Sequence, residues 1–254
     1  MGGKETVLAS VPYDRLALVY DAIPPGQAYQ SVLQQALEVF SCHANIKSIV
    51  DLACGTGSAT ISLSAMGYQV TGLDLSPGMI DAARRKAQAA GEAPLFKVDD
   101  MRTFRLEESV DAVVCFGDAA NHLLEEKDLR SWLFSVKTAL RPGGLLVFDV
   151  NTLCGLKEWD GETYVLHNED FAYICECVLL EDVMTVNATF FLPQPEPPHF
   201  YRHHETFWER AWPLAFWNQS LQEAGFEALH CWGWQTQDPG SERDRHVTIT
   251  ARRR

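Results

Sequence analysis

Two aspartates and two glycines are spaced so that they could bind a ligand that carries a ribose. Asp51 ends a short apolar run, Gly55 and Gly57 follow in a turn, and Asp74 lies 17 residues past Gly57. Glycines at such a turn accept positive φ angles and let the backbone approach a ligand closely. The Asp74 carboxylate could accept hydrogen bonds from both ribose hydroxyls, each worth about 1.5–3 kcal/mol. Thr60 replaces the third glycine of dinucleotide-binding turns, which disfavours a pyrophosphate ligand.

Short apolar runs alternate with amphipathic segments through the first 150 residues, and this alternation is typical of a parallel sheet covered by helices. We predict strands over 47–52, 67–75, 95–98, 110–116 and 145–150, and helices over 28–43, 76–90 and 129–140. Ser76 and Pro77 indicate a helix start, and Gly91 a helix end. The Pro-Gly-Gly at 142–144 is predicted to end the last helix. The pattern therefore predicts β-α-β units with right-handed crossovers.

The alternation breaks after residue 151. Residues 163–208 are predicted to form successive strands without helices between them, over 164–167, 171–180, 183–191 and 200–207. Pro193 and the three prolines that follow it are predicted to form a loop before the last of these strands. A helix at 213–224 and strands at 228–234 and 247–251 complete the chain. We therefore predict an α/β fold, a doubly wound sheet with an antiparallel β insertion after the fifth strand.

Several of these segments resemble a known family. Asp51–Gly57 (D-L-A-C-G-T-G) and Gly72–Ser76 (G-L-D-L-S) resemble the first motif and its successor in class I S-adenosylmethionine-dependent methyltransferases. Val98–Met101 resembles the family's adenine-binding segment, Asp111–Gly117 its fourth motif, and Leu140–Leu146 the lead into its fifth strand. The resemblance covers nearly the whole chain. It implies a Rossmann-like methyltransferase sheet and S-adenosylmethionine as the cofactor.

Three further segments narrow the resemblance to one bacterial subgroup of small-molecule methyltransferases. They are Tyr13–Asp21, Asp118–Leu123 and Glu209–Trp212. The subgroup is similar to the N-methyltransferases of deoxyamino sugars, and it carries an antiparallel insertion after the fifth strand. The end of the strand–helix alternation after residue 151 matches that insertion.

The resemblance implies a set of cofactor-binding residues around the glycine-rich turn and the neighbouring strand ends. Asp100 is expected to face the exocyclic amine of adenine, and Met101 to lie against the ring. Ala53 stands where the family usually has glycine, and alanine is a common variant there. The expected cofactor-binding residues are Tyr13, Asp51, Ala53, Gly55, Gly57, Asp74, Leu75, Met79, Asp100, Met101, Phe116 and Gly117.

Methyl transfer from a sulfonium is an in-line displacement, in which position and alignment contribute about 7–11 kcal/mol of the barrier. The acceptor needs a free lone pair, and a hydroxyl acceptor usually needs a base. His122 follows the fourth strand by six residues and is the leading catalytic candidate, either as that base or as a residue that shapes the pocket. Tyr20, together with Tyr13, lies on an N-terminal segment that could close over the cofactor. It is the second catalytic candidate, with aromatic packing as the alternative.

Polar residues on later segments are candidates for binding the methyl acceptor. Asn151 lies just past the fifth strand, where a turn-forming role is equally compatible. Residues 203–205 (His-His-Glu) alternate between the two faces of a strand, so they cannot easily share one ion and we predict no metal site. Arg210 is expected to form an ion pair or part of a lid. The expected acceptor-binding residues are Asn121, Asn151, His203, His204 and Arg210.

Composition limits the classes of function. The chain has 21 Lys and Arg against 34 Asp and Glu, a formal net charge of −13. This argues against nucleic-acid and anionic-membrane partners, which need a positive surface. No apolar run approaches the ~18 residues of a membrane span. The seven cysteines are scattered and contain no C-x-x-C, so we expect reduced thiols and a cytoplasmic protein.

The favoured function is S-adenosylmethionine-dependent methyl transfer to a nitrogen or oxygen atom of a small molecule. The alternative is a non-catalytic S-adenosylmethionine-binding protein with a regulatory or assembly role. A nicotinamide oxidoreductase and a nucleic-acid methyltransferase fit less well, because the chain lacks Y-x-x-x-K and N-P-P-Y sequences near the fourth strand. We expect residues 1–152 and 209–254 to form the cofactor-binding core. Residues 153–208 are expected to form a substrate lid or the surface of a homodimer.

Overall fold

A seven-stranded sheet forms the base of the molecule in this computed structural model, which describes residues 11–23, 29–43, 45–194 and 199–254. Four parallel pairings join β3, β2, β1, β4 and β5, and β11 then pairs antiparallel with both β5 and β10. The strands, in spatial order, are β10 (Phe226–Gly233), β11 (His246–Arg253), β5 (Leu140–Asn151), β4 (Val110–Cys115), β1 (Ser48–Leu52), β2 (Gln69–Asp74) and β3 (Leu95–Val98).

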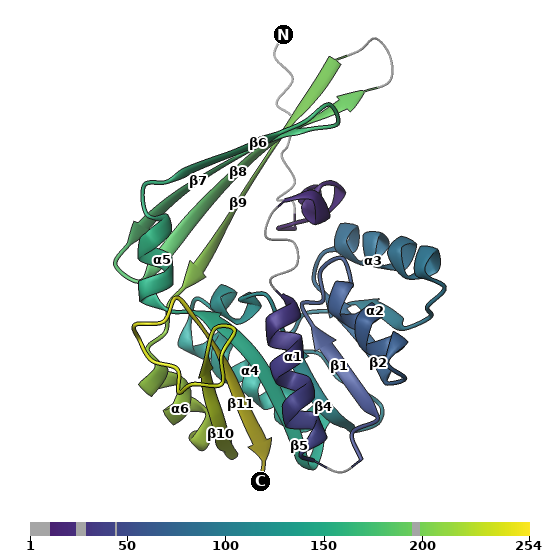
Figure 1. Ribbon diagram of the computed structural model, residues 1–254, viewed down its shortest axis with the longest axis vertical. Helices are drawn as coiled ribbons and strands as arrows, with labels where there is room; N and C mark the ends of the chain where they lie inside the picture. The colour runs from purple at the N-terminus through teal and green to yellow at the C-terminus, as the bar shows by residue number, and fades with distance from the viewer. Residues whose placement is uncertain (1–10, 24–28, 44, 195–198) are drawn as a thin grey trace.

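Helices cover both faces of this sheet (Figure 1). On one face pack α1 (Tyr29–Ser41) and α2 (Ser58–Ala65), and on the other α4 (Glu126–Ala139) and α6 (Leu214–Glu223). Successive side chains of a strand point to opposite faces. In β5, Val147 therefore joins the core under α1, whereas Phe148 joins Trp132 and Trp217 under α4 and α6.

The helix α3 (Pro77–Ala90) begins and ends as the sequence predicts. The Ser76 side chain accepts a hydrogen bond from the Met79 N–H at 3.1 Å, and Pro77 occupies the first turn. Gly91 ends the helix with φ of 72°. Because α3 begins directly after β2, its start lies at the sheet edge where Asp74 ends that strand.

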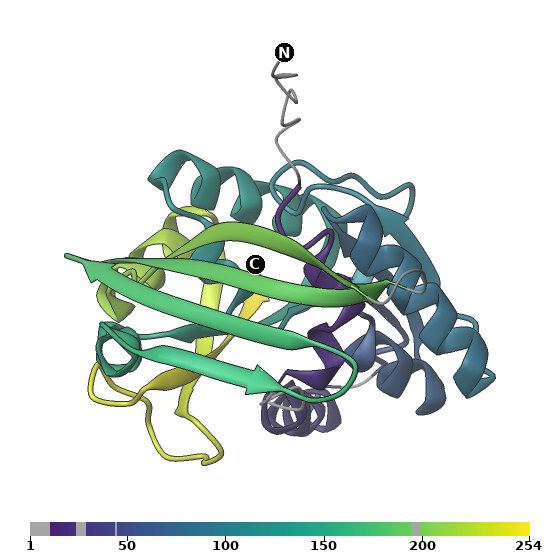
Figure 2. The same cartoon turned by 90° about the horizontal axis from the view of Figure 1, so that it is seen from above.

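A second, four-stranded antiparallel sheet lies over the first (Figure 2). It consists of β6 (Thr163–His167), β7 (Ala172–Leu180), β8 (Val183–Gln194) and β9 (His199–Arg210). The helix α5 (Leu153–Trp159) joins it to β5. The inward side of this second sheet packs Phe171, Tyr173, Phe190 and Phe207 against the N-terminal segment. That segment contains the short 3₁₀ helices η1 (Leu16–Leu18) and η2 (Tyr20–Ala22).

The predicted fold class is confirmed, with differences in local detail. Leu140 and the Pro-Gly-Gly at 142–144 belong to β5 rather than to the end of α4. Pro193 was predicted in a loop but lies in β8 opposite Phe200. Beyond Phe191 the strand β8 pairs only with β9, so its other side is a sheet edge, where proline is tolerated. The other three prolines of that predicted loop lie outside the described residues.

The helix α5 was not predicted, and the four-stranded sheet extends past its predicted end. The helix has only seven residues and includes Gly155, so its helical pattern is weak in the sequence. The Thr152 side chain begins it by accepting the Gly155 N–H at 3.2 Å. The strand β9 continues to Arg210, two residues beyond the expected end of the insertion at residue 208.

Candidate active site

The glycine-rich turn after β1 places backbone atoms along the wall of a cavity. Ala53 and Gly55 line this cavity with φ angles of 52° and 55°. A Cβ atom at Gly55 would meet nothing within 4 Å, whereas one at Gly57 would lie 2.9 Å from Ala83 and Phe96. Gly55 therefore leaves open space for a ligand. Gly57 does not line the cavity; instead it lets the start of α2 pack against α3 and β3.

Asp74 connects this turn to the end of β2. Its two carboxylate oxygens accept the backbone N–H groups of Gly55 and Ser76, both at 2.8 Å. Burial raises the pKa of Asp74, and these two N–H groups and the nearby His122 oppose that rise. A carboxylate can accept about four hydrogen bonds. Asp74 can therefore hold the turn and still accept bonds from a ligand in the cavity, which it lines.

Asp51 lies beneath the same turn, at 1% exposure. The hydroxyl of Thr60, in the first turn of α2, donates to its Oδ2 atom at 2.5 Å. Burial raises the pKa of Asp51 to about 7, because a charged carboxylate is poorly solvated there. The side chain therefore ties β1 to α2 from inside the cavity wall.

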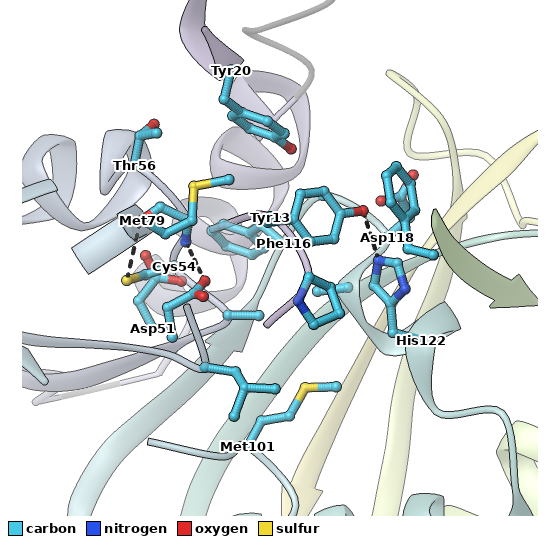
Figure 3. Close-up of a pocket in the computed structure, with 18 of the residues that line it drawn as sticks. Tyr13, Tyr20, Asp51, Cys54, Thr56, Met79, Met101, Phe116, Asp118 and His122 are labelled. Atoms are coloured by element: carbon cyan, nitrogen blue, oxygen red, sulfur yellow. Dashed lines mark hydrogen bonds between the residues drawn. The ribbon is translucent and has the colours of Figure 1, made fainter. Parts of the chain in front are cut away.

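The cavity measures about 500 Å³ and lies between the carboxyl ends of the parallel strands and the second sheet. One wall is the glycine-rich turn with Asp74, and the opposite wall is the loop after β4. The N-terminal segment contributes Tyr13 and Tyr20 (Figure 3), and β9 contributes Phe207 and Trp208. Parallel strands bring their carboxyl ends to one edge of a sheet, which explains why residues distant in the sequence meet here.

The N-terminal segment is bound to the large sheet and its helices by two aspartates. Asp14 accepts the backbone N–H of Gly78, at the start of α3, at 2.7 Å. Asp21 accepts the hydroxyl of Thr56 at 2.6 Å and pairs with Lys86 at 2.6 Å. The segment therefore crosses the cavity beside the glycine-rich turn.

The four-stranded sheet holds the same segment through Glu205, a residue of β9 that is 5% exposed. Its carboxylate accepts the backbone N–H groups of Tyr13 at 2.6 Å, Arg15 at 2.8 Å and Leu16 at 3.1 Å. Tyr13 has φ of 66°, which is uncommon for a residue with a side chain. Glu205 thus fixes the backbone from which the Tyr13 ring enters the cavity.

His122 lies in this cavity and has a partner at each ring nitrogen. Its Nδ1 atom is 2.7 Å from the carbonyl oxygen of Trp208, which can only accept, so Nδ1 carries the proton. Its Nε2 atom is 3.1 Å from the hydroxyl of Tyr13 (Figure 3). In the neutral ring Nε2 therefore accepts the Tyr13 hydroxyl proton. The Tyr20 ring lies edge-on to Tyr13, with ring centroids 6.1 Å apart.

Asp118 is a cavity residue that the sequence interpretation did not single out. It follows Gly117 at the end of β4 and has φ of 52°. Its Oδ2 atom accepts the side-chain amide of Asn151 at 2.7 Å. Burial raises the pKa of Asp118, and the charges of Glu209 and Asp149 raise it further. Its one indication in the sequence is its position, directly after the fourth strand in Asp118–Leu123.

Most of the predicted site residues meet in this cavity. Asp100 lines it, but both of its carboxylate oxygens already accept hydrogen bonds from Arg102 at 2.6–3.0 Å. The predicted residues that line the cavity are Tyr13, Tyr20, Asp51, Ala53, Gly55, Asp74, Leu75, Met79, Asp100, Met101, Phe116, Gly117 and His122.

The structure places five predicted acceptor-binding residues outside the lining of the cavity. Asn121 is fully buried, and its amide donates to the backbone carbonyls of Asn151 and Arg210, both at 2.9 Å. The Asn151 side chain lies behind Asp118. The Arg210 guanidinium pairs with Asp182 at 3.0 Å and stacks on the Trp212 ring. These three residues connect segments of the chain.

The two adjacent histidines of β9 also miss the cavity lining. His203 stacks on Phe190, with ring centroids 5.2 Å apart. His204 is exposed on the other face of the sheet, 3.0 Å from the hydroxyl of Thr189. Neither of the pair faces the cavity, as had been expected of one of them, because the inward positions nearest the cavity are Glu205 and Phe207.

Comparison with known proteins identifies the family. Residues 49–144 match a methyltransferase domain family. A candidate methyltransferase of Geobacillus sp. (strain WCH70) is 30% identical over 247 residues, which cover 95% of this chain and 99% of that protein. A candidate methyltransferase of Bacillus subtilis (strain 168) is 34% identical over 186 residues, covering 72% and 74%. The chain belongs to the S-adenosylmethionine-dependent methyltransferases.

Solved structures of methyltransferases share the fold. An S-adenosylmethionine-dependent methyltransferase from Clostridium acetobutylicum superposes with a TM-score of 0.83 at 21% identity, covering 95% of this methyltransferase and 98% of that chain. The sugar N-methyltransferase KedS8 from Streptoalloteichus has a TM-score of 0.74 at 22% identity, covering 100% and 98%. The predicted cofactor, S-adenosylmethionine, is confirmed by the family.

The residues of the cavity fit that cofactor. The open space beside Gly55 would admit a ligand that lies close to the backbone, and Asp74 can accept hydrogen bonds from the ribose hydroxyls. Met79, Met101 and Phe116 add apolar surface to the cavity for a planar base. Within the described residues no group of three or more metal-ligating side chains occurs, and no helix there is long and apolar enough to cross a membrane.

Proposed function

We propose that this methyltransferase transfers the methyl group to a nitrogen or oxygen atom of a small molecule. The observation that carries the proposal is the hydrogen-bonded pair of Tyr13 and His122, which lines the cavity on the side away from the glycine-rich turn. The pair offers a hydroxyl to an acceptor at the place where the methyl group would be presented. The roof formed by β9 and the N-terminal segment favours a small acceptor over a polymer.

Bound S-adenosylmethionine supplies a methyl group on a sulfonium, which a lone pair of the acceptor displaces to leave S-adenosylhomocysteine. The protein has to hold that lone pair in line and keep it free of a proton. The Tyr13 hydroxyl donates to His122 Nε2, so its oxygen can accept an N–H or O–H of the acceptor. His122 can then receive a proton through Tyr13, while its Nδ1–H stays on the Trp208 carbonyl.

Tyr20 has a different part in this proposal. Burial raises its pKa, and the charges of Asp118 and Asp74 raise it further, so the phenol stays neutral. We therefore assign Tyr20 to positioning the ligands in the cavity, by its ring and its neutral hydroxyl. Proton transfer from an acceptor hydroxyl falls to the Tyr13–His122 pair.

The four-stranded sheet is the roof of the acceptor site in this proposal. Phe207 and Trp208 of β9 line the cavity, which supports a lid role for residues 153–208. The outward face of this sheet carries exposed apolar side chains, among them Val165, Val178 and Leu180, which supports the homodimer. Sedimentation at micromolar concentration tests the dimer, and a monomer throughout would contradict it.

The test of the proposed function begins with the cofactor. S-adenosylhomocysteine at one hundred times its dissociation constant should add about 2.7 kcal/mol of stability and raise the melting temperature by a few degrees, whereas NAD should not. Labelled S-adenosylmethionine is then offered with panels of small amines and alcohols. Methylation of a panel member supports the proposal. Tight cofactor binding without transfer to any of them favours the non-catalytic alternative.

A further inference from the structure

Two carboxyl groups meet at one side-chain amide on the acceptor side of the cavity. The amide nitrogen of Asn151 lies 2.7 Å from an oxygen of Asp118 and 3.3 Å from an oxygen of Glu209. Asp118 comes from the loop after β4 in the large sheet, and Glu209 from β9 in the four-stranded sheet. The acceptor side of the cavity therefore has a carboxyl group from each sheet within reach of the same donor.

A buried network holds Asp118 in place. Asp149 accepts the backbone N–H groups of Gly117 and Asp118, both at 2.9 Å. His246 Nε2 lies 2.6 Å from the same Asp149 oxygen that accepts the Asp118 N–H, and His246 Nδ1 lies 3.1 Å from the amide oxygen of Asn151. This contact directs the amide nitrogen of Asn151 toward Asp118. Asp118 thus keeps its unusual φ of 52° because its neighbours fix both its backbone and its side chain.

In the described part of the chain, no arginine or lysine forms an ion pair with Asp118 or Glu209; the nearby Arg210 binds Asp182 and the carbonyl of Leu124 instead. Asp118 Oδ1 has no hydrogen-bond partner among the described residues, and Asp118 lines the cavity. A half-buried carboxyl group in this setting favours a cationic ligand or a retained proton.

We propose that Asp118 receives the methyl acceptor as a protonated amine and takes the proton that frees its lone pair. The inference rests on the proposed function and narrows it to nitrogen acceptors. Glu209 is a positioning residue here, because it adds negative charge behind Asp118 but does not line the cavity. The pair would bind an ammonium group and would repel a carboxylate or a phenolate at the same place.

The proton balance of the step is complete. One N–H of the ammonium passes its proton to the Asp118 carboxylate, and the nitrogen becomes a neutral amine. Its lone pair forms the new N–C bond as the bond from that carbon to sulfur breaks, which gives the methylated ammonium and S-adenosylhomocysteine. Asp118 loses its proton to solvent after the product leaves. Burial raises the pKa of Asp118, which brings it closer to that of an amine.

The Tyr13–His122 pair and Asp118 then have separate tasks. The lone pair of His122 Nε2 already accepts the Tyr13 hydroxyl, so the histidine reaches the acceptor only through that tyrosine. Asp118 has a free oxygen for direct contact. We therefore expect Tyr13 to orient the neutral amine and Asp118 to bind and deprotonate the charged one.

The test compares matched acceptors and matched variants. Cyclohexylamine and cyclohexanol, and further amine and alcohol pairs, are offered to the wild type, to Asp118→Asn, to Glu209→Gln and to Glu227→Gln. The last variant removes a surface carboxylate on β10 that pairs with Arg252, so it serves as the charge control. The wild type should prefer amines by at least 100-fold. Asp118→Asn should lose about 10²–10³-fold in kcat/KM for amines, with S-adenosylhomocysteine affinity within twofold of wild type.

A binding measurement adds a readout that does not depend on turnover, and comparing several variants means that the misfolding of one of them does not decide the test. With S-adenosylhomocysteine present, N-methylcyclohexylamine should raise the melting temperature of the wild type and of Glu227→Gln. The rise should be smaller for Glu209→Gln and absent for Asp118→Asn. An equal rise in Asp118→Asn, or amine turnover within threefold of wild type, overturns the inference. A wild type that methylates only alcohols overturns it and leaves the proposed function standing; one that methylates neither class overturns both.

Discussion

The two sides of the cavity are built differently. The side with the glycine-rich turn consists of residues close together in the sequence, from Asp51 to Met79, at the ends of β1 and β2. The acceptor side combines Tyr13, His122, Asp118 and Glu205, which come from three distant segments and both sheets. Local sequence specifies the first side, whereas long-range packing assembles the second. Changes on the two sides should therefore affect different measurable properties.

The largest expected effect concerns the acceptor side. His122→Phe should lower kcat by about 10²–10⁴-fold and leave S-adenosylhomocysteine affinity within twofold. Tyr13→Phe should do nearly the same, and the double variant should lose no more than the worse single one, because the two residues act as one unit. Steady-state kinetics and calorimetry measure both properties. Tyr68→Phe, outside the cavity, is the control. Additive losses in the double variant would show that Tyr13 and His122 act independently.

The second effect is the pH dependence of stability caused by Asp51, on the cofactor side. The unfolded carboxyl ionises near pH 3.8, whereas the folded one keeps its proton up to about pH 7. The folded state therefore binds more protons in this window, and the contribution of Asp51 to the free energy of unfolding falls by about 3 kcal/mol as pH rises from 4 to 7. Asp51→Asn should lack this fall in urea denaturation at both pH values. The same pH slope in wild type and variant would contradict the prediction; Asp81→Asn on the surface is the control.

The third effect is on cofactor affinity. Asp74→Ala should weaken S-adenosylhomocysteine binding by about 1.5–3 kcal/mol through loss of the ribose bonds. It also frees the Gly55 and Ser76 N–H groups, so Asp74→Asn, which keeps one acceptor oxygen, should lose less. Calorimetric titration measures the difference. Wild-type affinity in Asp74→Ala would exclude this carboxylate from the cofactor site.

The smallest effect separates two glycines of the same turn. Gly57→Ala should cost about 2 kcal/mol of stability, from positive φ and the clash with Ala83 and Phe96. Gly55→Ala should cost only about 1 kcal/mol, because its Cβ meets open space. That methyl group would occupy the ligand's space, so cofactor affinity should fall more in Gly55→Ala. Urea denaturation and titration check both variants, and the reverse ranking of affinities would contradict the assignment of Gly57 to packing.

The sequence predicts the core of the fold well because its signals are local. The helix at 76–90 has its cap, its proline and its terminal glycine within the segment itself, and the structure places it at Pro77–Ala90. The helix α5 and the place of Pro193 depend on what packs around them, so local patterns miss both. Pro193 in particular extends β8 only because β9 continues beside it.

The site divides in the same way. The cofactor side follows from a motif, whereas Asn121 and Asn151 were taken as acceptor ligands because they follow strand ends. The structure uses both amides to join buried segments. Asp118 carries a comparable positional signal, but its pKa is raised by burial and by the charge of Glu209, which is 91 residues further along the chain. Such a relation appears only once the two sheets are placed together.

The attachment of the N-terminal segment has a consequence for turnover. Asp21 joins this segment to the turn at Thr56, and the same segment carries the Tyr13 hydroxyl that faces His122. If the segment lifts to exchange the cofactor, the acceptor compartment loses a wall at the same moment. The kinetic pattern should then be compulsory-order, with the methyl donor entering first and the spent donor leaving last. Product inhibition by S-adenosylhomocysteine would be competitive against the donor and noncompetitive against the acceptor.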